Sequence, residues 1–480
     1  MAAAATVHEL FPEHELRVEV PRGRTCALRV LSGLCEVFGS ELSAGAQDGP
    51  DGESVYHFEG PTSFAVFTWY KDCRVELSGV AADAAYMTDD SQMKTYASVH
   101  GRLNWKRDEA RRVSADGPRV LVCGPTNCGK STLARVLLAY AVRTGYAPTF
   151  VELDVGQGSL SVPGTVGAAV LSPRELTPDR GITAARPLVY WYGENAPDDA
   201  GERGRYGSVV GALAAAIDER TGNDEALRAS GLVVNTCGRV DDGGLRMILD
   251  AVREFSIELV LVIGDDRLHN RVSKELKAHP ALHRGPRLSE TAELIAVKLP
   301  RSGGAIDRSA ADRKAARAAA VARYFYGLPG RDITLAPCEH HLSFSDVDIF
   351  AFEHPTSGSI VDSGLTSLGA GGGAAADLIA SGGDGGRDSE ESKDAVRVVR
   401  VDVDKALVHS ILAVVHAPNL GGAAAGDGAV GTSMALSSVA GFVSVKAVNM
   451  DTRTITVLSP ASAALPSRTL LKGSLTWLDQ

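Results

Sequence analysis

The chain has 480 residues, of which 44% are hydrophobic and 22% are charged, and its formal net charge is −10. This length predicts two to four domains. The acidic balance excludes a protein that binds nucleic acid over its whole surface, so any RNA contact has to come from a local basic patch. The seven cysteines contain no C-x-x-C pair, which argues against a disulfide framework or a zinc site. Because no apolar run is long enough for a signal peptide or a membrane span, we expect a soluble intracellular protein without membrane association.

The first 100 residues are typical of a β domain. Short stretches in which apolar and polar residues alternate are separated by turn residues, and this pattern predicts a small sandwich or barrel. The stretches lie at 16–20, 26–30, 65–69 and 74–77. The charged residues 101–117 follow, and we expect a helix there that ends by Asp116 and leads into a second domain.

A glycine-rich loop stands between an apolar run and a helical pattern, with the spacing G-x-x-x-x-G-K-S. Its residues are Gly124, Pro125, Thr126, Asn127, Cys128, Gly129, Lys130, Ser131 and Thr132. The glycines let backbone N–H groups surround a phosphate, and the helix N-terminus adds its positive dipole end. Lys130 can reach the β- and γ-phosphates, and the Ser131 hydroxyl can ligate Mg²⁺. The alternative, a glycine turn before a structural helix, rarely gives a full match in this context. The motif therefore predicts a nucleoside triphosphate site.

Residues 118 to about 335 alternate apolar runs with helical patterns. Candidate buried strands lie at 119–123, 149–153, 188–192, 232–235, 259–263 and 293–298. This order predicts a mostly parallel sheet flanked by helices. In such folds nucleotide chemistry takes place at the carboxyl ends of the strands, which selects the polar residues that can take part.

Two polar residues follow the second of these strands. Asp154 lies at its carboxyl end, where a carboxylate can order the water molecules of Mg²⁺ or take a proton from an attacking hydroxyl. Gln157 can orient the γ-phosphate or a water molecule. The alternative for Asp154 is a turn residue whose side chain bonds nearby backbone N–H groups.

A basic segment follows the last of these strands. Gly303 and Gly304 precede a helical stretch that contains Arg308, Arg313 and Arg317. We interpret this segment as a mobile lid whose arginines neutralise charge on transferring phosphates. The alternative is a solvated basic helix face. We find no N-K-x-D loop of the kind that selects guanine, so ATP is favoured over GTP.

Residues 336–480 return to short strands, at 397–403, 441–445 and 454–458. Two inserts rich in glycine and alanine, at about 364–395 and at 421–431, are expected to be disordered. We assign no chemistry to either insert.

Several motifs carry a resemblance to a known family. They lie at 65–69, 124–132, 151–159, 161–165, 234–238, 301–304, 324–327 and 458–460. On these residues the chain resembles the polyribonucleotide 5′-hydroxyl kinases that double as the ATP-binding subunit of the pre-mRNA cleavage and polyadenylation machinery. The resemblance covers nearly the whole chain except the two inserts.

The resemblance implies a fold and a setting. It implies an N-terminal β-sandwich (1–100), a central α/β P-loop domain with a mostly parallel sheet (101–335) and a small α+β C-terminal domain (336–480). It also implies a nuclear protein that binds ATP and that has RNA and the other subunits of the pre-mRNA cleavage factor complex as partners.

The resemblance also implies roles for individual residues. Glu15 matches a glutamate that helps to hold the adenine nucleotide, and Ser63 stands where the family has a nearby lysine. Lys130 and Ser131 match the phosphate and Mg²⁺ positions, and Asp154 matches the general base. The arginines of the lid correspond to Arg308 and Arg313.

Two departures affect the expected substrate site. Active members carry a threonine pair that clasps the substrate, where this chain has residues 193–197 with Asn195 and no threonine. Active members also place a tryptophan on the first RNA base, and here that residue is Arg239. An arginine plane can stack on a base, although it is not equivalent to a tryptophan. Since stacking contributes roughly 1–3 kcal/mol per base, its loss would weaken RNA binding.

Two functions are therefore open at this point. The departures favour an ATP-bound scaffold that is required for cleavage of the pre-mRNA 3′ end. The alternative is an active ATP-dependent RNA 5′-hydroxyl kinase, which would also act on tRNA splicing intermediates. In that case Asp154 takes the proton of the 5′-hydroxyl, while Lys130, Mg²⁺, Arg308 and Arg313 stabilise the transition state.

Overall fold

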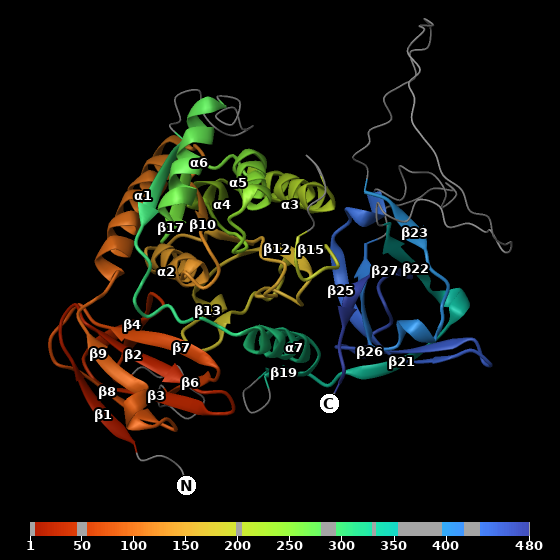
Figure 1. Cartoon of the computed structure of the whole chain (residues 1–480), viewed down its shortest axis with the longest axis horizontal. Coiled ribbons are helices and arrows are strands. Elements are labelled where there is room, and N and C mark those ends of the chain that lie inside the picture. The colour runs from red at the N-terminus through yellow and green to blue at the C-terminus, as the bar shows by residue number, and fades with distance from the viewer. Residues whose placement is uncertain are drawn as a thin grey trace, which may run out of the picture.

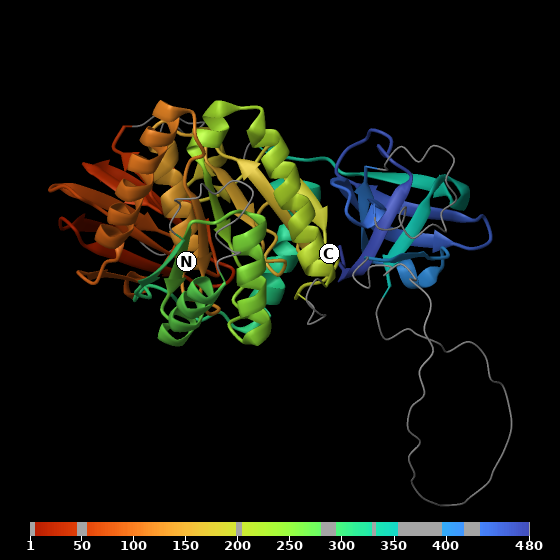
Figure 2. The same cartoon turned by 90° about the horizontal axis from the view of Figure 1, so that it is seen from above.

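The computed structural model describes residues 5–45, 55–197, 204–279, 294–328, 333–353, 396–416 and 433–479. The two inserts that we expected to be disordered lie outside these residues. Figure 1 shows a β domain at the N-terminal end, a central α/β part and a second β-rich part at the C-terminal end. Figure 2 shows from above that the central part lies between the other two.

The N-terminal part is a β-sandwich, as the sequence predicts. One sheet has the order β1 (Thr6–Leu10), β8 (Cys73–Ser78), β3 (Thr25–Ser32) and β6 (Val55–Glu59). The other has the order β5 (Ser40–Ser43), β4 (Leu34–Val37), β7 (Thr62–Phe67), β2 (Glu15–Val20) and β9 (Ala85–Thr88). Alternate residues of β2, namely Leu16, Val18 and Val20, point into the core between the sheets. The opposite face of β2 carries Glu15 and Arg17, which are also buried.

Helix α1 (Met93–Val113) connects the sandwich to the central part. It begins before residue 101, inside the stretch that the sequence assigned to the N-terminal domain. It ends before Asp116, as predicted, because Ser114 adopts a left-handed conformation with φ of 51°.

The central part is built on a seven-stranded sheet. The strand order is β15 (Leu188–Trp191), β12 (Thr165–Val170), β11 (Thr149–Glu152), β16 (Leu232–Asn235), β10 (Arg119–Cys123), β17 (Leu259–Ile263) and β18 (Ile295–Leu299). Of these strands only β12 is antiparallel to its neighbours. The prediction of a mostly parallel sheet is therefore confirmed, and β12 is the strand that the sequence analysis missed.

Helices cover both faces of this sheet, which buries the strands almost completely. The core of one face contains residues of α1 and of α2 (Lys130–Arg143). The core of the other face contains residues of α3 (Arg205–Gly222), α5 (Asp242–Glu254) and α6 (Asp266–Ala278). A short helix α4 (Glu225–Ser230) and a small hairpin, β13 (Leu176–Thr177) with β14 (Gly181–Ile182), complete the central part.

The C-terminal part holds a second seven-stranded sheet. Its order is β21 (Cys338–Ser343), β26 (Thr454–Ser459), β25 (Val439–Asn449), β24 (Ser410–Val415), β27 (Thr469–Thr476), β22 (Asp348–Phe352) and β23 (Val398–Arg400). Helix α7 (Ala310–Tyr326) packs Val321 and Phe325 into the core of this part. A two-stranded ribbon of β19 (Gly327–Leu328) and β20 (Ile333–Thr334) follows α7.

Polar contacts join the sandwich to α2. The Glu36 carboxylate is buried, and it accepts hydrogen bonds from the Tyr140 hydroxyl (2.5 Å) and from Arg143 (2.9 Å). Burial raises the pKa of Glu36, and its contacts with Tyr140 and Arg143 oppose this shift. Arg135 of α2 lies over the Phe38 ring, 4.0 Å from its centre. Because α2 begins at the phosphate loop, the sandwich supports the helix that carries the site.

Close packing joins the central part to the C-terminal part. The Ser474 backbone N–H donates to the Gly193 carbonyl (2.8 Å), and a Cβ added at Gly473 would lie only 2.2 Å from that oxygen. The Arg205 guanidinium lies between the rings of Tyr192 (4.5 Å) and Phe352 (4.6 Å). The loop after β15 is therefore held directly by β27.

None of the helices in the described part of the chain combines the length and the apolar character needed to cross a bilayer.

Candidate nucleotide site

The phosphate loop joins the end of β10 to the start of α2. Gly124, Asn127 and Gly129 have φ angles of 146°, 61° and 99°. A side chain at Gly124 would collide with the Ile263 carbonyl, 2.6 Å from the position of its Cβ. The Lys130 ammonium donates to the carbonyls of Gly124 (3.0 Å) and Pro125 (2.8 Å), so it arches over the loop. The loop thus gathers backbone N–H groups, a helix N-terminus and a cation around one small volume.

Other residues of the loop support it in different ways. The Cys128 side chain is buried in the core that contains residues of α1 and α2, and this packing holds the loop against that core. Thr126 packs against the loop after β16, because a Cβ at Gly238 would lie 2.3 Å from the Thr126 hydroxyl. Thr132 is exposed on the first turn of α2.

A buried polar network lies beside the loop. Glu152, the last residue of β11, accepts hydrogen bonds from Ser159 Oγ (2.6 Å) and from the Asp154 backbone N–H (3.0 Å). Asn235, the last residue of β16, donates from Nδ2 to both oxygens of Glu152, at 2.9 and 3.2 Å. The same Nδ2 lies 3.3 Å from Ser131 Oγ. These contacts connect the carboxyl ends of two neighbouring strands to the start of α2.

The Asp154 carboxylate is hydrogen-bonded within the turn that follows β11. Its Oδ1 accepts from the Gly156 backbone N–H and its Oδ2 from Gln157 Nε2, each at 3.0 Å. Burial raises the pKa of Asp154, while the hydrogen bonds from Gly156 and Gln157 and the charge of Lys130 oppose the shift. Burial, and then the nearby Asp154 charge, raise the pKa of Glu152 to about 7. Both carboxyl groups therefore titrate closer to neutral pH than exposed carboxyl groups do.

The donor set at this edge of the sheet fits Mg²⁺. Ser131 and Asp154 offer the hard oxygen atoms that this ion prefers. Asn235 Oδ1 is buried and has no hydrogen-bond partner among the described residues. A buried acceptor without a donor is costly, and a water molecule bound to a metal ion would supply one. Ser131, Asp154 and Asn235 are the residues that would face the ion.

The structure places Glu15 and Ser63, the two residues expected near the adenine nucleotide, at different points of the sandwich. The buried Glu15 carboxylate accepts from Arg17 Nε (2.9 Å) and from Ser91 Oγ (2.7 Å). In the pairing of β2 with β7, Glu15 lies opposite Phe67, whereas Ser63 lies opposite Glu19. Four residues along a strand separate two positions by about 13 Å. Ser63 and Glu15 are therefore not adjacent, and the role of Ser63 in nucleotide binding stays a prediction.

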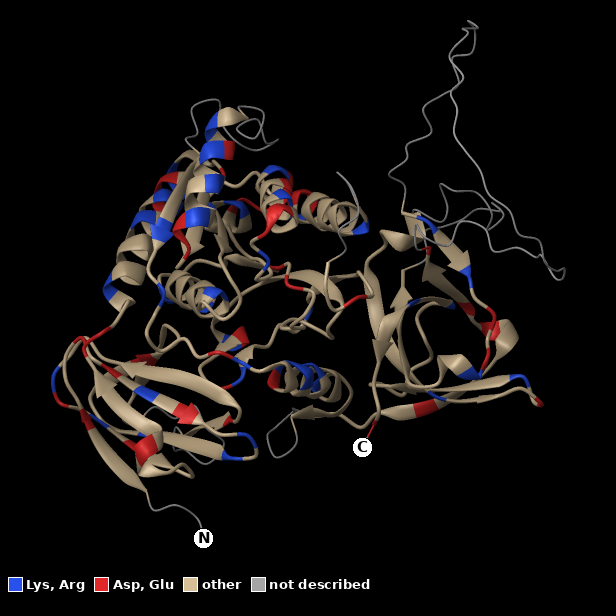
Figure 3. Cartoon of the chain, viewed as in Figure 1, with Lys and Arg blue, Asp and Glu red and all other residues tan. Residues whose placement is uncertain are grey.

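The lid arginines lie on the surface. Arg308 and Arg313 are exposed, and Arg313 Nη1 donates to the Arg308 carbonyl (2.6 Å). Figure 3 shows the basic residues of α7 on the helix that lies between the sandwich and the C-terminal part. Within the described residues neither arginine contacts Lys130 or Asp154. The geometry thus places both arginines beside the start of α7, away from Lys130 and Asp154, and their role in a lid stays a prediction.

The two residues expected at the substrate site, Asn195 and Arg239, have different surroundings. The Asn195 carbonyl lies beside Asp154, because a Cβ at Gly156 would be 3.1 Å from this oxygen and 3.2 Å from Asp154 Oδ1. Arg239 is instead paired with Asp241, the N-cap of α5, through Nε at 2.8 and 3.0 Å. Its guanidinium also closely covers Gly243. The Asn195 backbone is thus near Asp154, and Arg239 is held at the start of a helix.

Glu152, Asn235 and Ser159 are the site residues that sequence reasoning missed. A signal for Glu152 was present, because a glutamate inside an otherwise apolar strand needs buried partners. No sequence pattern indicates the contact of Glu152 with Asn235, which lies 83 residues further along the chain.

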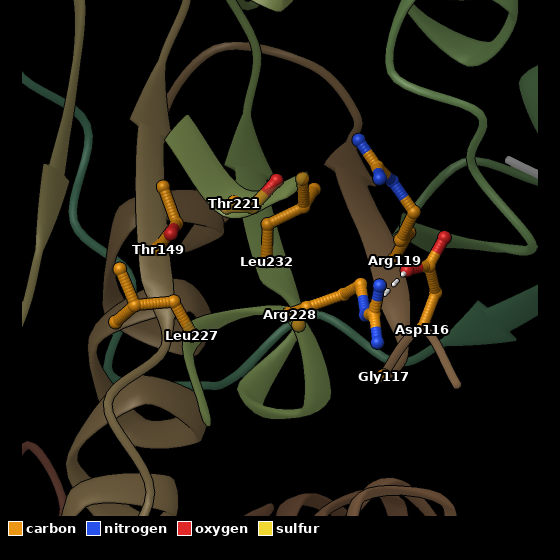
Figure 4. Close-up of a pocket in the computed structure, with 9 residues that line it drawn as sticks. Asp116, Gly117, Arg119, Thr149, Thr221, Leu227, Arg228 and Leu232 are labelled. Atoms are coloured by element: carbon orange, nitrogen blue, oxygen red, sulfur yellow. Dashed lines mark ion pairs between the residues drawn. The ribbon is translucent and has the colours of Figure 1, made fainter. Parts of the chain in front are cut away.

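A small cavity lies at the other end of the sheet, near the starts of β10, β11 and β16. Figure 4 shows its lining, which includes the paired Asp116 and Arg228 and the hydroxyl of Thr149. Its volume is about 10 Å³, which leaves room for about one water molecule. Its position and size exclude it as the nucleotide site.

Comparisons with known proteins match all three parts of the chain. The family model of the mRNA cleavage and polyadenylation factor CLP1 P-loop matches residues 124–327. The model of the N-terminal β-sandwich domain of polyadenylation factor matches residues 9–110, and that of the pre-mRNA cleavage complex II protein Clp1 matches residues 335–479.

Similar proteins match over nearly their full lengths. Polyribonucleotide 5′-hydroxyl-kinase Clp1 of Gallus gallus is 34% identical over 98% of this chain and 96% of its own length. The protein of the same name from Homo sapiens is 34% identical over 99% of this chain and 97% of its own length. The protein CLP1 homolog of Arabidopsis thaliana is 34% identical over 98% of this chain and 94% of its own length.

Two solved structures of Clp1p with Pcf11p have the same fold. One, which addresses ATP loss in a point mutant, has a TM-score of 0.74 at 19% identity and covers 99% of both chains. The other, of the wild-type complex, has a TM-score of 0.73 at 19% identity and covers 100% of both chains.

Proposed function

This chain belongs to the Clp1 family of mRNA cleavage and polyadenylation factors, and from this premise we propose that it acts in the nucleus as an ATP-bound scaffold of pre-mRNA 3′-end cleavage. Its P-loop domain makes it an ATP-binding protein. The proposal adds Mg²⁺ as the cation of the nucleotide and a Pcf11p-like subunit as a partner, because a solved relative with this fold was determined with Pcf11p.

The scaffold proposal depends on one observation. The residues expected to bind the nucleotide lie together, whereas the residue expected to stack on RNA is paired elsewhere. Lys130 is buried over the phosphate loop, Asp154 is half-buried, and the Asp154 backbone N–H belongs to the network beside the loop. Arg239, at the position that the family uses for base stacking, is paired with Asp241. A protein with this arrangement holds ATP without presenting a stacking surface to RNA.

Bound ATP would then contribute to stability. Nucleotide that binds only the folded chain stabilises it by mass action, by about 2.7 kcal/mol at a concentration about 100-fold above Kd. Glu15 of the sandwich and Lys130 of the central part would hold opposite ends of the same molecule. The nucleotide would therefore strengthen the contact between these two parts.

The second candidate is RNA 5′-hydroxyl phosphorylation, which the environment of Asp154 favours. A carboxylate whose pKa burial raises is a better proton acceptor, and the Asn195 carbonyl lies beside it. In this reaction the 5′-oxygen bonds to the γ-phosphorus, the bond from that phosphorus to the β–γ bridging oxygen breaks, and the proton passes to Asp154. Mg²⁺, when bound, neutralises phosphate charge, and Lys130 orients the γ-phosphate.

One experiment separates the two functions. Purified protein is incubated with Mg²⁺, γ-labelled ATP and a short RNA with a 5′-hydroxyl, and bound nucleotide is measured in parallel. For a scaffold we expect stoichiometric ATP and no label on RNA. Label transfer that disappears in Lys130→Ala and Asp154→Asn would establish the kinase instead. A protein that retains no ATP would refute both candidates.

A further inference from the structure

We propose that Asn235 is a positioning residue for Mg²⁺, which orients the Ser131 hydroxyl from one side while Glu152 fixes the orientation of its amide. This inference depends on the ATP·Mg²⁺ site of the proposed function, but it does not depend on phosphoryl transfer.

The position of Asn235 makes this role available. It ends β16, which lies between β11, the strand of Glu152, and β10, the strand that leads into the phosphate loop. Its side chain is completely buried. Its backbone carbonyl also accepts from the Leu153 N–H (2.9 Å), so the residue is held through both main chain and side chain.

Hydrogen bonding determines which way the amide points. Nδ2 carries two protons, and it has carboxylate oxygens of Glu152 at 2.9 and 3.2 Å and Ser131 Oγ at 3.3 Å. The flipped amide would place Oδ1 against that carboxylate, and both donor contacts with Glu152 would become repulsive. Glu152 is itself held by Ser159 and by the Asp154 N–H, so it is a fixed reference for the amide.

This orientation has two consequences for the cation. Ser131 Oγ accepts from Nδ2 with one lone pair, which leaves the second lone pair for a metal ion. Asn235 Oδ1, which is buried without a partner among the described residues, can accept from a water molecule of that ion. A residue with only a packing role would not need an acceptor there, because burying one without a donor is costly.

The test measures ATP affinity by titration calorimetry with Mg²⁺ and again with EDTA. For Asn235→Ala we expect the gain in affinity due to Mg²⁺ to fall about tenfold, in line with residues that orient metal ligands. Affinity in EDTA should remain within about twofold, because the phosphate contacts of Lys130 are intact. Asn235→Ser, which is also too short to make these contacts, gives the same readout if the alanine variant does not fold.

Three comparisons make the result specific. Glu152→Gln keeps an acceptor for Asn235 and should lose less of the Mg²⁺ gain than Asn235→Ala. Combining Asn235→Ala with Ser131→Ala should give no more loss than Ser131→Ala alone, since both act on one hydroxyl. Thr236→Ser keeps a buried hydroxyl that bonds the Val122 carbonyl (2.9 Å) next to Asn235 and should leave the Mg²⁺ gain unchanged.

Equal losses with Mg²⁺ and with EDTA would show that Asn235 only maintains the fold, and this would overturn the proposal. An unchanged Mg²⁺ gain in Asn235→Ala, alongside its loss in Ser131→Ala, would overturn it as well. If the unmodified protein binds no ATP under either condition, the proposed function fails and this inference fails with it.

Discussion

The residues expected to serve the nucleotide form two halves, a buried half at the central sheet and a lid half at α7, which are built in different ways. Lys130, Glu152 and Asn235 are buried, and hydrogen bonds hold them at the carboxyl ends of the central sheet. Arg308 and Arg313 are exposed at the start of α7, where one bonds the backbone of the other. Hydrogen bonds therefore hold the buried half in place, whereas the lid half would have to move to reach it.

The surroundings of α7 explain this difference. Asp312, in its first turn, pairs with Arg22 of the sandwich (3.0 Å). Gly303 and Gly304 pack so closely on Arg17 that a Cβ at either would lie within 3.0 Å of its guanidinium nitrogens. The far end of α7 belongs to the C-terminal core. The lid is thus attached to both neighbouring parts, so its position depends on how these parts are placed.

The largest expected effect comes from a substitution in the buried half. Lys130→Ala removes the cation that faces the phosphates, and we expect ATP affinity to fall about 100-fold, or about 2.7 kcal/mol. Titration calorimetry measures this loss. Lys94→Ala, which removes a surface pair with Glu13 (2.6 Å), is the control and should bind ATP normally. Unchanged affinity in Lys130→Ala would contradict the assignment of the loop.

The next largest effect concerns the contact of the sandwich with helix α2, which begins at the phosphate loop. Arg143→Ala leaves the buried Glu36 carboxylate without its cationic partner, and we expect a loss of about 1–3 kcal/mol in the free energy of unfolding. Urea unfolding measures it. Arg112→Ala, which removes an exposed pair with Glu109, is the control. Equal stability of both variants would show that the sandwich does not support α2 through Glu36.

A smaller effect concerns pH. Burial raises the pKa of Glu152 from 4.5 to about 7, so its contribution to stability is fully present below pH 4.5 and is lost as pH rises through 7. Glu152→Gln cannot ionise, and we expect its Tm to fall less than that of the unmodified protein between pH 5 and pH 8, by about 1–2 °C. Exposed Glu9→Gln should follow the unmodified curve. Parallel curves for Glu152→Gln would show that this carboxyl titrates normally.

The smallest effect concerns the lid half. Replacing both Arg308 and Arg313 by alanine should change ATP affinity by no more than about threefold, because their side chains are exposed and outside the assembled site. The same calorimetric titration serves here. A loss as large as that of Lys130→Ala would show that the lid is closed over the nucleotide in solution, and the contrast between the two halves would then be wrong.

Much of the fold could be predicted from the sequence, because local patterns report local structure. Buried strands of the central sheet are continuous apolar runs, and the phosphate loop has a fixed spacing. Strand β12 was missed because Gly167, Ala168 and Ala169 at its centre lack the β-branched residues that mark a strand. An antiparallel strand also needs no crossover helix, so no helical pattern between β11 and β12 indicates the strand.

The rest of the site depends on contacts between distant residues. The position of Ser63 follows from strand register, which the residues near Ser63 do not reveal. The contact of Asn235 with Glu152 follows from the order of strands in the sheet. The exposure of Arg308 and Arg313 follows from the packing of α7 against other parts. A motif can therefore identify a site, but its supporting network has to be seen in the structure.

The contact between β15 and the C-terminal part has a consequence for solubility. Strand β15 lies at the edge of the central sheet, and Tyr190 within it forms an antiparallel bridge to Ser438 next to β25. Unpaired edge strands are templates on which other molecules add strands and aggregate. The C-terminal part covers this edge with its own backbone and with Phe442, whose ring lies 5.3 Å from that of Trp191. A fragment that ends after α7 would leave the edge open, and we expect it to self-associate at concentrations at which the full chain stays monomeric.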